Sequence, residues 1–282
     1  MVDPLREELR ALARDLQRHD ISLIVGGGYG LVLRAEMIVK SGSRTLVPDF
    51  PSARSTEDLD IFLKAEVISN SGKTGPIREA LDRRGYEPVV KHFQFEREID
   101  YMNRTRKVRV DFLAAPVPLE LGANVRADSV RVRPRDGKGL HAHLTPEALT
   151  VEESMIAIDI GDDDERLTIY LPHPFSYLLL KLHALRDRLD DEDTDYGRHH
   201  AFDLYSTIAT MTEQEWEESA RIKEKYRSAQ QVVEAQRIVS DLFADRRATG
   251  ALRLQEHARS TGYDLSQERL ELFLDSLQEL IA

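Results

Sequence analysis

Two spacings of apolar residues alternate along the first part of the chain, one typical of helices and the other of strands. Apolar residues three or four apart predict helices over residues 4–19 and 29–40, and a third helix is expected from Pro76 to about Gly85. Alternating or short apolar runs predict strands at residues 21–25, 58–63, 86–90, 93–99 and 107–114. Glycine, proline and serine between residues 41 and 55 indicate a loop.

The pattern then changes twice. Residues 119–171 are polar, with expected strands at 129–133, 151–157 and 167–171, whereas the chain from His173 onward has helical spacing. Leucines at 178, 179, 182 and 185 predict one helix, a second follows near residue 205, and three or four amphipathic helices continue to Ala282. We therefore expect a mixed α/β (α+β) domain over residues 1–172, in which helices flank a mixed sheet, and a C-terminal helical domain over residues 173–282.

Composition narrows the class of protein. The 282 residues are 41% hydrophobic and 32% charged, which suits a globular protein with a real core. The absence of cysteine excludes disulfides, thiolate zinc sites and cysteine nucleophiles. The N-terminal segment is charged and no apolar run is long enough to span a bilayer, so we expect a cytoplasmic protein without a membrane partner.

The net charge of −11 argues against a general nucleic-acid coat, which would be basic. Arginines nevertheless gather in residues 97–109 and 126–138, where a local basic face could meet a polyanion. Solvent-exposed strand and loop surface is the simpler explanation of the same arginines.

The strand expected around Asp58 and Asp60 carries the most informative chemistry. Leu59 and Ile61 alternate with these aspartates, so both carboxylates project from one face of the strand. Neighbouring carboxylates repel, and one would retain its proton unless a divalent cation such as Mg²⁺ binds them. A later apolar strand carries Asp111, and three carboxylates on neighbouring strands indicate a metal-dependent phosphoryl-transfer site. A pair of surface carboxylates is the alternative, but it would not account for Asp111.

A glycine turn precedes this strand. Residues 25–33 have the order strand, Gly26-Gly-Gly28, helix, in which the backbone can approach a phosphate and a helix N-terminus offers free N–H groups. The spacing is neither that of a dinucleotide-binding fold nor that of a P-loop, so a plain tight turn remains an alternative.

The order of glycine turn, helix, Asp-x-Asp strand and lone-Asp strand resembles the nucleotidyltransferase superfamily typified by DNA polymerase β. Within it, the chain is most similar to the AbiEii-type nucleotidyltransferases, toxins of abortive-infection and type IV-like toxin–antitoxin systems. The most specific match is Arg54-Ser-Thr-Glu-Asp-Leu-Asp60, which is similar to their Arg-x-Thr-x-Asp-hydrophobic-Asp signature. Gly27-Gly-Tyr-Gly-Leu31 is similar to their Gly-Gly-x-Ala-Leu turn, and Arg109-Val-Asp111 to their third-carboxylate strand.

Two further matches lie nearer the C-terminus. Leu179-Leu-Lys-Leu-His-Ala-Leu-Arg186 resembles the helix that carries their lysine, here Lys181. Arg198-His-His-Ala-Phe-Asp-Leu204 resembles their Arg-x-Lys-Asp-x-x-Asp-Leu block, although two histidines stand where the family often has Lys-Asp.

The resemblance implies a two-metal site. Asp58, Asp60 and Asp111 would hold two Mg²⁺ ions, with Mn²⁺ as an alternative, and Asp111 would also act as base toward an incoming hydroxyl. The residues expected to bind the nucleotide are Gly27, Gly28, Arg54, Thr56 and Lys181.

Arg198 and Asp203 would form an ion pair that orients Lys181. Ordinary alternatives are a lysine that reaches out of an apolar helix and a surface salt bridge. His199 and His200 are expected on different helix faces, as solvated or core-edge residues rather than metal ligands.

The resemblance implies transfer of a nucleoside monophosphate from an NTP to a hydroxyl acceptor, with release of pyrophosphate. The expected acceptor is a tRNA 3′ end, which would make the protein a growth-arresting toxin with a cognate antitoxin protein as partner. Two alternatives remain open: a small-molecule nucleotidyltransferase, of the kind that adenylylates aminoglycosides, and an inactive nucleotide-binding module.

Overall fold

The computed structural model describes residues 3–51, 56, 58–90, 92–101, 104–137, 139–162 and 165–282. The chain forms two compact units, each with its own buried core. The first unit combines Met1–Gly30 with Arg54–Pro172, and the second combines Leu31–Ala53 with His173–Ala282.

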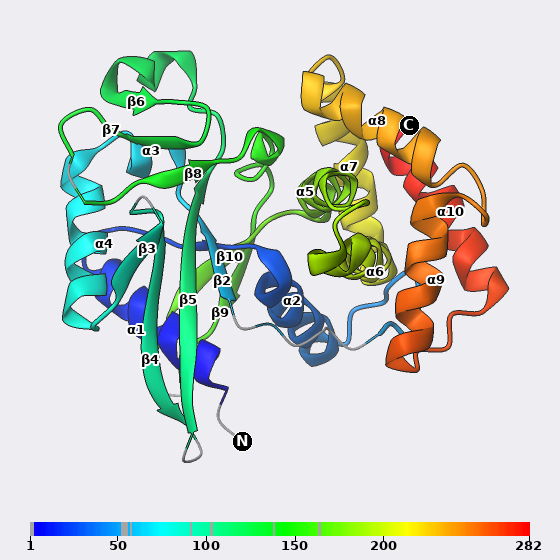
Figure 1. Ribbon diagram of the computed structural model, residues 1–282, viewed down its shortest axis with the longest axis horizontal. Coiled ribbons are helices and arrows are strands. Elements are labelled where there is room, and N and C mark those ends of the chain that lie inside the picture. The colour runs from blue at the N-terminus through cyan, green and yellow to red at the C-terminus, as the bar shows by residue number, and fades with distance from the viewer. Residues whose placement is uncertain are drawn as a thin grey trace. The chain divides into compact units, whose positions relative to one another are not determined.

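The first unit is organised around a ten-stranded sheet that mixes parallel and antiparallel neighbours. The main path is β6-β7-β8-β5-β2-β1-β10-β9, while β4 pairs with β5 and β3 with β4. The strands are β1 (Ile24–Val25), β2 (Asp58–Phe62), β3 (Glu87–Val90), β4 (Gln94–Tyr101), β5 (Arg104–Ala114), β6 (Val125–Ala127), β7 (Arg131–Pro134), β8 (Ala142–Leu144), β9 (Ile156–Asp159) and β10 (Thr168–Leu171). The long strands β4 and β5 run side by side (Figure 1).

Short and long helical segments flank this sheet. They are α1 (Pro4–Gln17), α3 (Ala65–Ile68), α4 (Ser71–Arg83) and the 3-10 segments η1 (Leu119–Asn124) and η2 (Pro146–Ala148). Helix α1 forms because Asp3 caps it, accepting a bond from Leu5 N at 3.0 Å, and because leucines such as Leu9 and Leu12 recur on one buried face. That face meets α4 and β2. The mixed α/β fold class predicted from the sequence is confirmed.

Several boundaries differ from those expected. Helix α4 begins at Ser71 rather than at Pro76, because Asn70 caps it by accepting a bond from Gly72 N at 2.8 Å. The strand expected at residues 151–157 begins only at Ile156, since residues 151–154 form a turn. Strands β6 and β8 have three residues each, too few to give a periodic signal in the sequence.

The second unit is helical. Its segments are α5 (Pro174–Asp187), η3 (Glu192–Gly197), α6 (Arg198–Ala209), α7 (Glu213–Tyr226), α8 (Gln230–Leu242), α9 (Thr249–Thr261) and α10 (Gln267–Ile281), together with most of α2 (Gly27–Ser41). Helix α5 contacts α6, α7 and α8 (Figure 1). Four of its leucines, Leu178, Leu179, Leu182 and Leu185, are 0% exposed. Among the described helices, none is both long and apolar enough to cross a membrane.

Candidate functional site

The site is built on two parallel neighbours in the middle of the sheet, β2 and β5. Their register pairs Asp58 with Arg109 and Asp60 with Asp111. Leu59 and Val110, one position further along each strand, are 0% exposed. Because side chains alternate along a strand, the buried positions force the three aspartates onto the opposite, half-exposed face. The structure thus brings all three predicted carboxylates to one face of the sheet.

Gly27 fits closely against one of these carboxylates. It begins α2 with a φ of +58°, which only glycine adopts readily, and a Cβ placed on it would lie 1.7 Å from Asp60 Oδ2. Gly26 N also donates to the backbone oxygen of Asp60 at 2.8 Å. The glycine turn therefore positions the start of α2 directly beside the carboxylate, and any side chain at position 27 would displace it.

Asp111 is the carboxylate in the most unfavourable electrostatic surroundings. Burial raises its pKa to about 6, and the charges of Asp60 and Asp58 act in the same direction. A bond from Gln94 Nε2 to Asp111 Oδ2, at 3.2 Å, opposes the shift. The other oxygen, Oδ1, is buried without a hydrogen-bond partner.

Arg109 partly compensates the negative charge. Its guanidinium lies 3.9 Å from Asp58 Oδ1 and 3.3 Å from Glu96 Oε2. Glu96 also binds Lys107, and the bonds from Lys107 and Arg109 hold the pKa of Glu96 below its usual value. Arg109 is thus shared between Asp58 and Glu96.

The donor set fits a hard divalent cation. Mg²⁺ and Mn²⁺ prefer carboxylate oxygens, and the unpartnered Asp111 Oδ1 faces a charge conflict that such an ion would remove. Among the described residues, no three acidic or histidine side chains converge closely enough to form a complete metal shell. Asp58 instead lies near Arg109, and Asp111 is bonded to Gln94.

The predicted nucleotide-binding residues lie around the same strands. Gly28 is buried in the first turn of α2, and Thr56 is half-buried just before β2. Arg54 lies outside the described residues.

The other predicted residues lie in the second unit. Lys181 Nζ donates to Asp203 Oδ2 at 2.7 Å, and the two residues are only 6% and 2% exposed. Lys181 therefore does not reach out to solvent, and it binds the aspartate directly. Arg198 takes other partners, Glu256 at 2.9 Å and Asp195 at 3.0 Å, because positions 198 and 203 are on different faces of α6.

The adjacent histidines of α6 lie at the edge of the core, His199 half-buried and His200 buried. Their ring centroids are 3.9 Å apart, so the two rings contact each other. No metal-ligand role follows from this contact.

Two contacts of the site were not predicted from the sequence, that of Gln94 with Asp111 and that of Arg109 with Asp58. Arg109 lies two positions before Asp111, so alternation alone would have placed it on the same face. Gln94 faces Asp111 through the antiparallel register of β4 and β5, which no local pattern reveals.

The two arginine-rich stretches have different surroundings. In the first, Arg97 binds Glu8 at 2.7 Å and is engaged in holding β4 to α1. In the second, Arg126 faces Arg133 directly across β6 and β7, and Arg131 faces His143 on β8.

Strand pairing carries this second stretch to the aspartate face. His143 is also the register partner of Leu113, which lies two positions after Asp111 on β5 and therefore on the same face. Register partners share a face of the sheet. Arg126, Arg131 and Arg133, which we call the arginine strip, therefore lie on the same face as the three aspartates.

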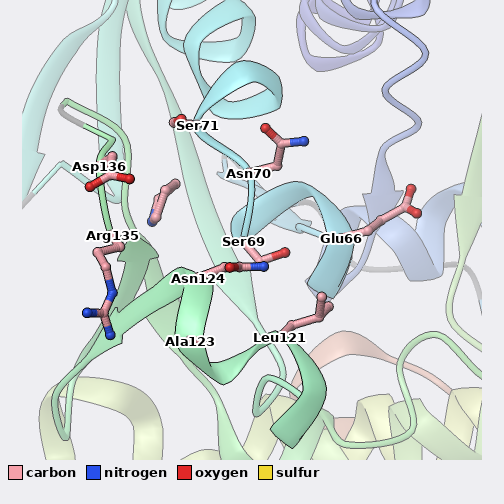
Figure 2. A pocket seen from close by; sticks show the side chains of 10 residues that line it. Glu66, Ser69, Asn70, Ser71, Leu121, Ala123, Asn124, Arg135 and Asp136 are labelled. Carbon is pink, nitrogen blue, oxygen red and sulfur yellow. The ribbon is translucent and has the colours of Figure 1, made fainter.

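A polar pocket of about 490 Å³ opens elsewhere in the first unit. Figure 2 shows Asn70 and Ser71 at the entry to α4, Asn124 at the end of η1, and Arg135 and Asp136 after β7. The three aspartates are not among the described residues that line it.

Comparisons with known proteins give no assignment. No protein-family model matches the chain, and no curated protein matches it in sequence.

Proposed function

We propose that the protein is a metal-dependent nucleotidyltransferase that moves a nucleoside monophosphate from an NTP to a hydroxyl acceptor. The observation that carries the proposal is the in-register placement of Asp58, Asp60 and Asp111 on one sheet face. Bound Mg²⁺ would neutralise the triphosphate and polarise the reacting oxygens. The carboxylates would hold it, and Asp111 would in addition accept the proton of the incoming hydroxyl.

The glycine turn supports a phosphate-binding role beside this site. Gly27 and Gly28 supply the first N–H groups of α2, where the partial positive charge of a helix N-terminus favours an anion. Thr56 and Arg54 precede β2, and a guanidinium binds phosphate through two parallel bonds. The motif resemblance also implies a phosphate-binding role for Lys181, whose ammonium is bonded to Asp203 in the structure.

The arginine strip supports an RNA acceptor, with a tRNA 3′ end as the expected substrate. It places three cations on the face that carries the carboxylates, although the whole protein has a net charge of −11. Strands are about 4.8 Å apart, so the strip would begin roughly 10 Å from β5, within reach of successive phosphates of one strand. A cognate antitoxin protein is the partner that the resemblance leads us to expect.

A small-molecule acceptor is the second candidate function. Such an enzyme would not need the arginine strip.

Incubation of the protein with each α-³²P-labelled NTP, Mg²⁺ and total tRNA tests the proposal. We expect label in RNA with one NTP, and no label with Asp58→Ala/Asp60→Ala, provided that this variant keeps the circular dichroism spectrum of the wild type. Label on the protein itself would identify a protein acceptor. No label and no Mg²⁺-dependent NTP binding would contradict the transferase proposal and favour an inactive module.

Replacement of Arg126, Arg131 and Arg133 by glutamine separates the two acceptors. Labelling of RNA should fall and its dependence on salt should flatten, since fewer counterions are released on binding. Unchanged labelling would favour the small-molecule acceptor.

A further inference from the structure

A hollow of about 790 Å³ lies in the second unit, between residues 43–46 and the start of α7. The loop that forms one wall is held by backbone bonds, with Leu46 N donating to Met211 O at 3.0 Å and Val47 N donating to Ala209 O at 3.1 Å. The volume lies within the range of small-ligand sites, roughly 300–1,000 Å³.

The wall formed by α7 is fixed by a charged network. Thr212 and Glu215 form a capping box, and Arg34, which is 1% exposed, donates to both carboxylate oxygens of Glu215 at 2.7 Å. Burial favours the protonated form of Glu215, but the bonds from Arg34 outweigh it and hold the pKa below its usual value. Glu213 and Glu217, the other acids of α7 that line the hollow, take no part in this network and are not needed to position the first turn of the helix.

Those acids flank an aromatic ring inside the hollow. Trp216 is the only tryptophan of the chain, and it lines the hollow half-buried. Glu213 is a helical neighbour of Trp216, three positions later, and of Glu217, four positions later, and all three side chains line the hollow. Two like charges four residues apart destabilise a helix, and a cation between them would remove this repulsion.

The charges that line the hollow are available to a ligand. Within the described part of the chain, the side chains of Glu213, Glu217 and Arg44 have no ion-pair partner. The two carboxylates outnumber the single guanidinium, which gives the hollow a net negative charge beside the indole ring.

We propose that this hollow binds a small organic cation with an aliphatic or flat body, such as an alkylguanidinium. The cation would lie over the face of Trp216, where the ring quadrupole attracts it, and between Glu213 and Glu217. The apolar body would cover Leu46 and Met211, which also line the hollow. A carboxylate at the other end of a zwitterionic ligand would bind Arg44.

The fluorescence of Trp216 reports binding directly, because no other tryptophan contributes. We would titrate the whole protein with n-pentylguanidine and with n-pentylurea, which has a similar shape but no charge. Saturable binding of the guanidine, at least about tenfold tighter than that of the urea, is the expected result. Equal affinities, or no saturation by about 50 mM guanidine, would overturn the proposal.

Matched variants exclude a general charge effect. Glu217→Gln should weaken guanidine binding about tenfold, whereas Glu224→Gln, the same change on α7 at a residue paired with Arg227, should leave it unchanged. Equal weakening by both variants would show that only the net charge matters. A blocked tripeptide with a central arginine tests the other source of a guanidinium, and binding of this peptide without binding of the free guanidine would contradict a small-molecule site.

Discussion

The sequence motifs contain two groups of charged residues, and these groups differ in burial and in charge compensation. In the second unit, Lys181 and Asp203 are almost fully buried and compensate each other at 2.7 Å. In the first unit, Asp58, Asp60 and Asp111 are half-exposed, carry the same sign and lie on one face of the sheet, with Arg109 near Asp58. A buried charge must be paired for the fold to form, whereas a partly solvated excess of one sign is tolerable and leaves the site ready for an ion. The first group is therefore expected to control stability and the second to control ligand binding.

The largest effect should come from breaking the buried pair. Asp203→Leu or Lys181→Met alone leaves one uncompensated buried charge and should lower the free energy of unfolding by about 3–5 kcal/mol. The double variant removes both charges and should recover most of this loss. Urea denaturation of the four proteins checks the expectation.

The same double variant decides what Lys181 does beyond folding. If its stability recovers but nucleotidyl transfer stays lost, Lys181 has a role with the nucleotide phosphates. Recovery of both would restrict the pair to a structural role. Additive losses of stability in the double variant would contradict the idea that the two charges compensate each other.

The next effect tests the contact between the glycine turn and the carboxylates. Gly27→Ala forces a side chain into a left-handed backbone conformation and against Asp60, so we expect a loss of about 2–4 kcal/mol together with loss of transfer activity. Gly85→Ala is the matched control, since Gly85 has a φ of +75° with nothing within 4 Å of the added Cβ. It should cost only about 1 kcal/mol and leave activity intact. Equal effects of the two changes would mean that backbone strain, not the contact with Asp60, matters at position 27.

A third prediction uses the raised pKa of Asp111. The pKa of Asp111 is about 6 in the folded protein, above its usual value of 3.8. Between these two pH values the carboxyl is ionised in the unfolded chain but protonated in the folded one, so the free energy of unfolding falls as pH rises. Asp111→Asn should therefore raise the free energy of unfolding by about 1–2 kcal/mol at pH 7–8, a figure reduced for partial solvent screening, and by nothing below about pH 3.5.

Mg²⁺ should reduce the difference in stability between these two proteins. At pH 7.5, added Mg²⁺ should stabilise the wild type and narrow its difference from Asp111→Asn, because the ion binds the folded state through the carboxylates. Thermal unfolding at several pH values and Mg²⁺ concentrations measures both effects. A constant difference from pH 3.5 to pH 8 would contradict the raised pKa.

The sequence was sufficient to predict the faces of single elements but not the pairings between them. Alternation of Leu59 and Ile61 with the aspartates correctly predicted the strand β2 and its polar face, since burial alternates along a strand whatever its neighbours. The match of Asp60 to Asp111 depends on the register of β2 and β5, which is set by tertiary packing. The expected pair of Arg198 and Asp203 is not formed for a local reason, because five residues on a helix place the two side chains on different faces.

The smallest predicted effect tests the arginine strip. Arg126 and Arg133 are directly opposite on antiparallel neighbours, and like charges so placed destabilise a sheet. Arg126→Thr should therefore raise the free energy of unfolding by about 0.2–1 kcal/mol while it weakens RNA binding and lowers the slope of log affinity against log salt by about one. Arg166→Thr removes the same charge from an arginine that is 86% exposed between β9 and β10, and it should change neither quantity. A gain in stability coupled to a loss of RNA affinity would indicate that the strip keeps an unfavourable charge arrangement for the sake of a ligand. If Arg126→Thr lowers stability and leaves the salt dependence unchanged, the arginines are ordinary strand surface, and the carboxylate site must take its acceptor from another direction.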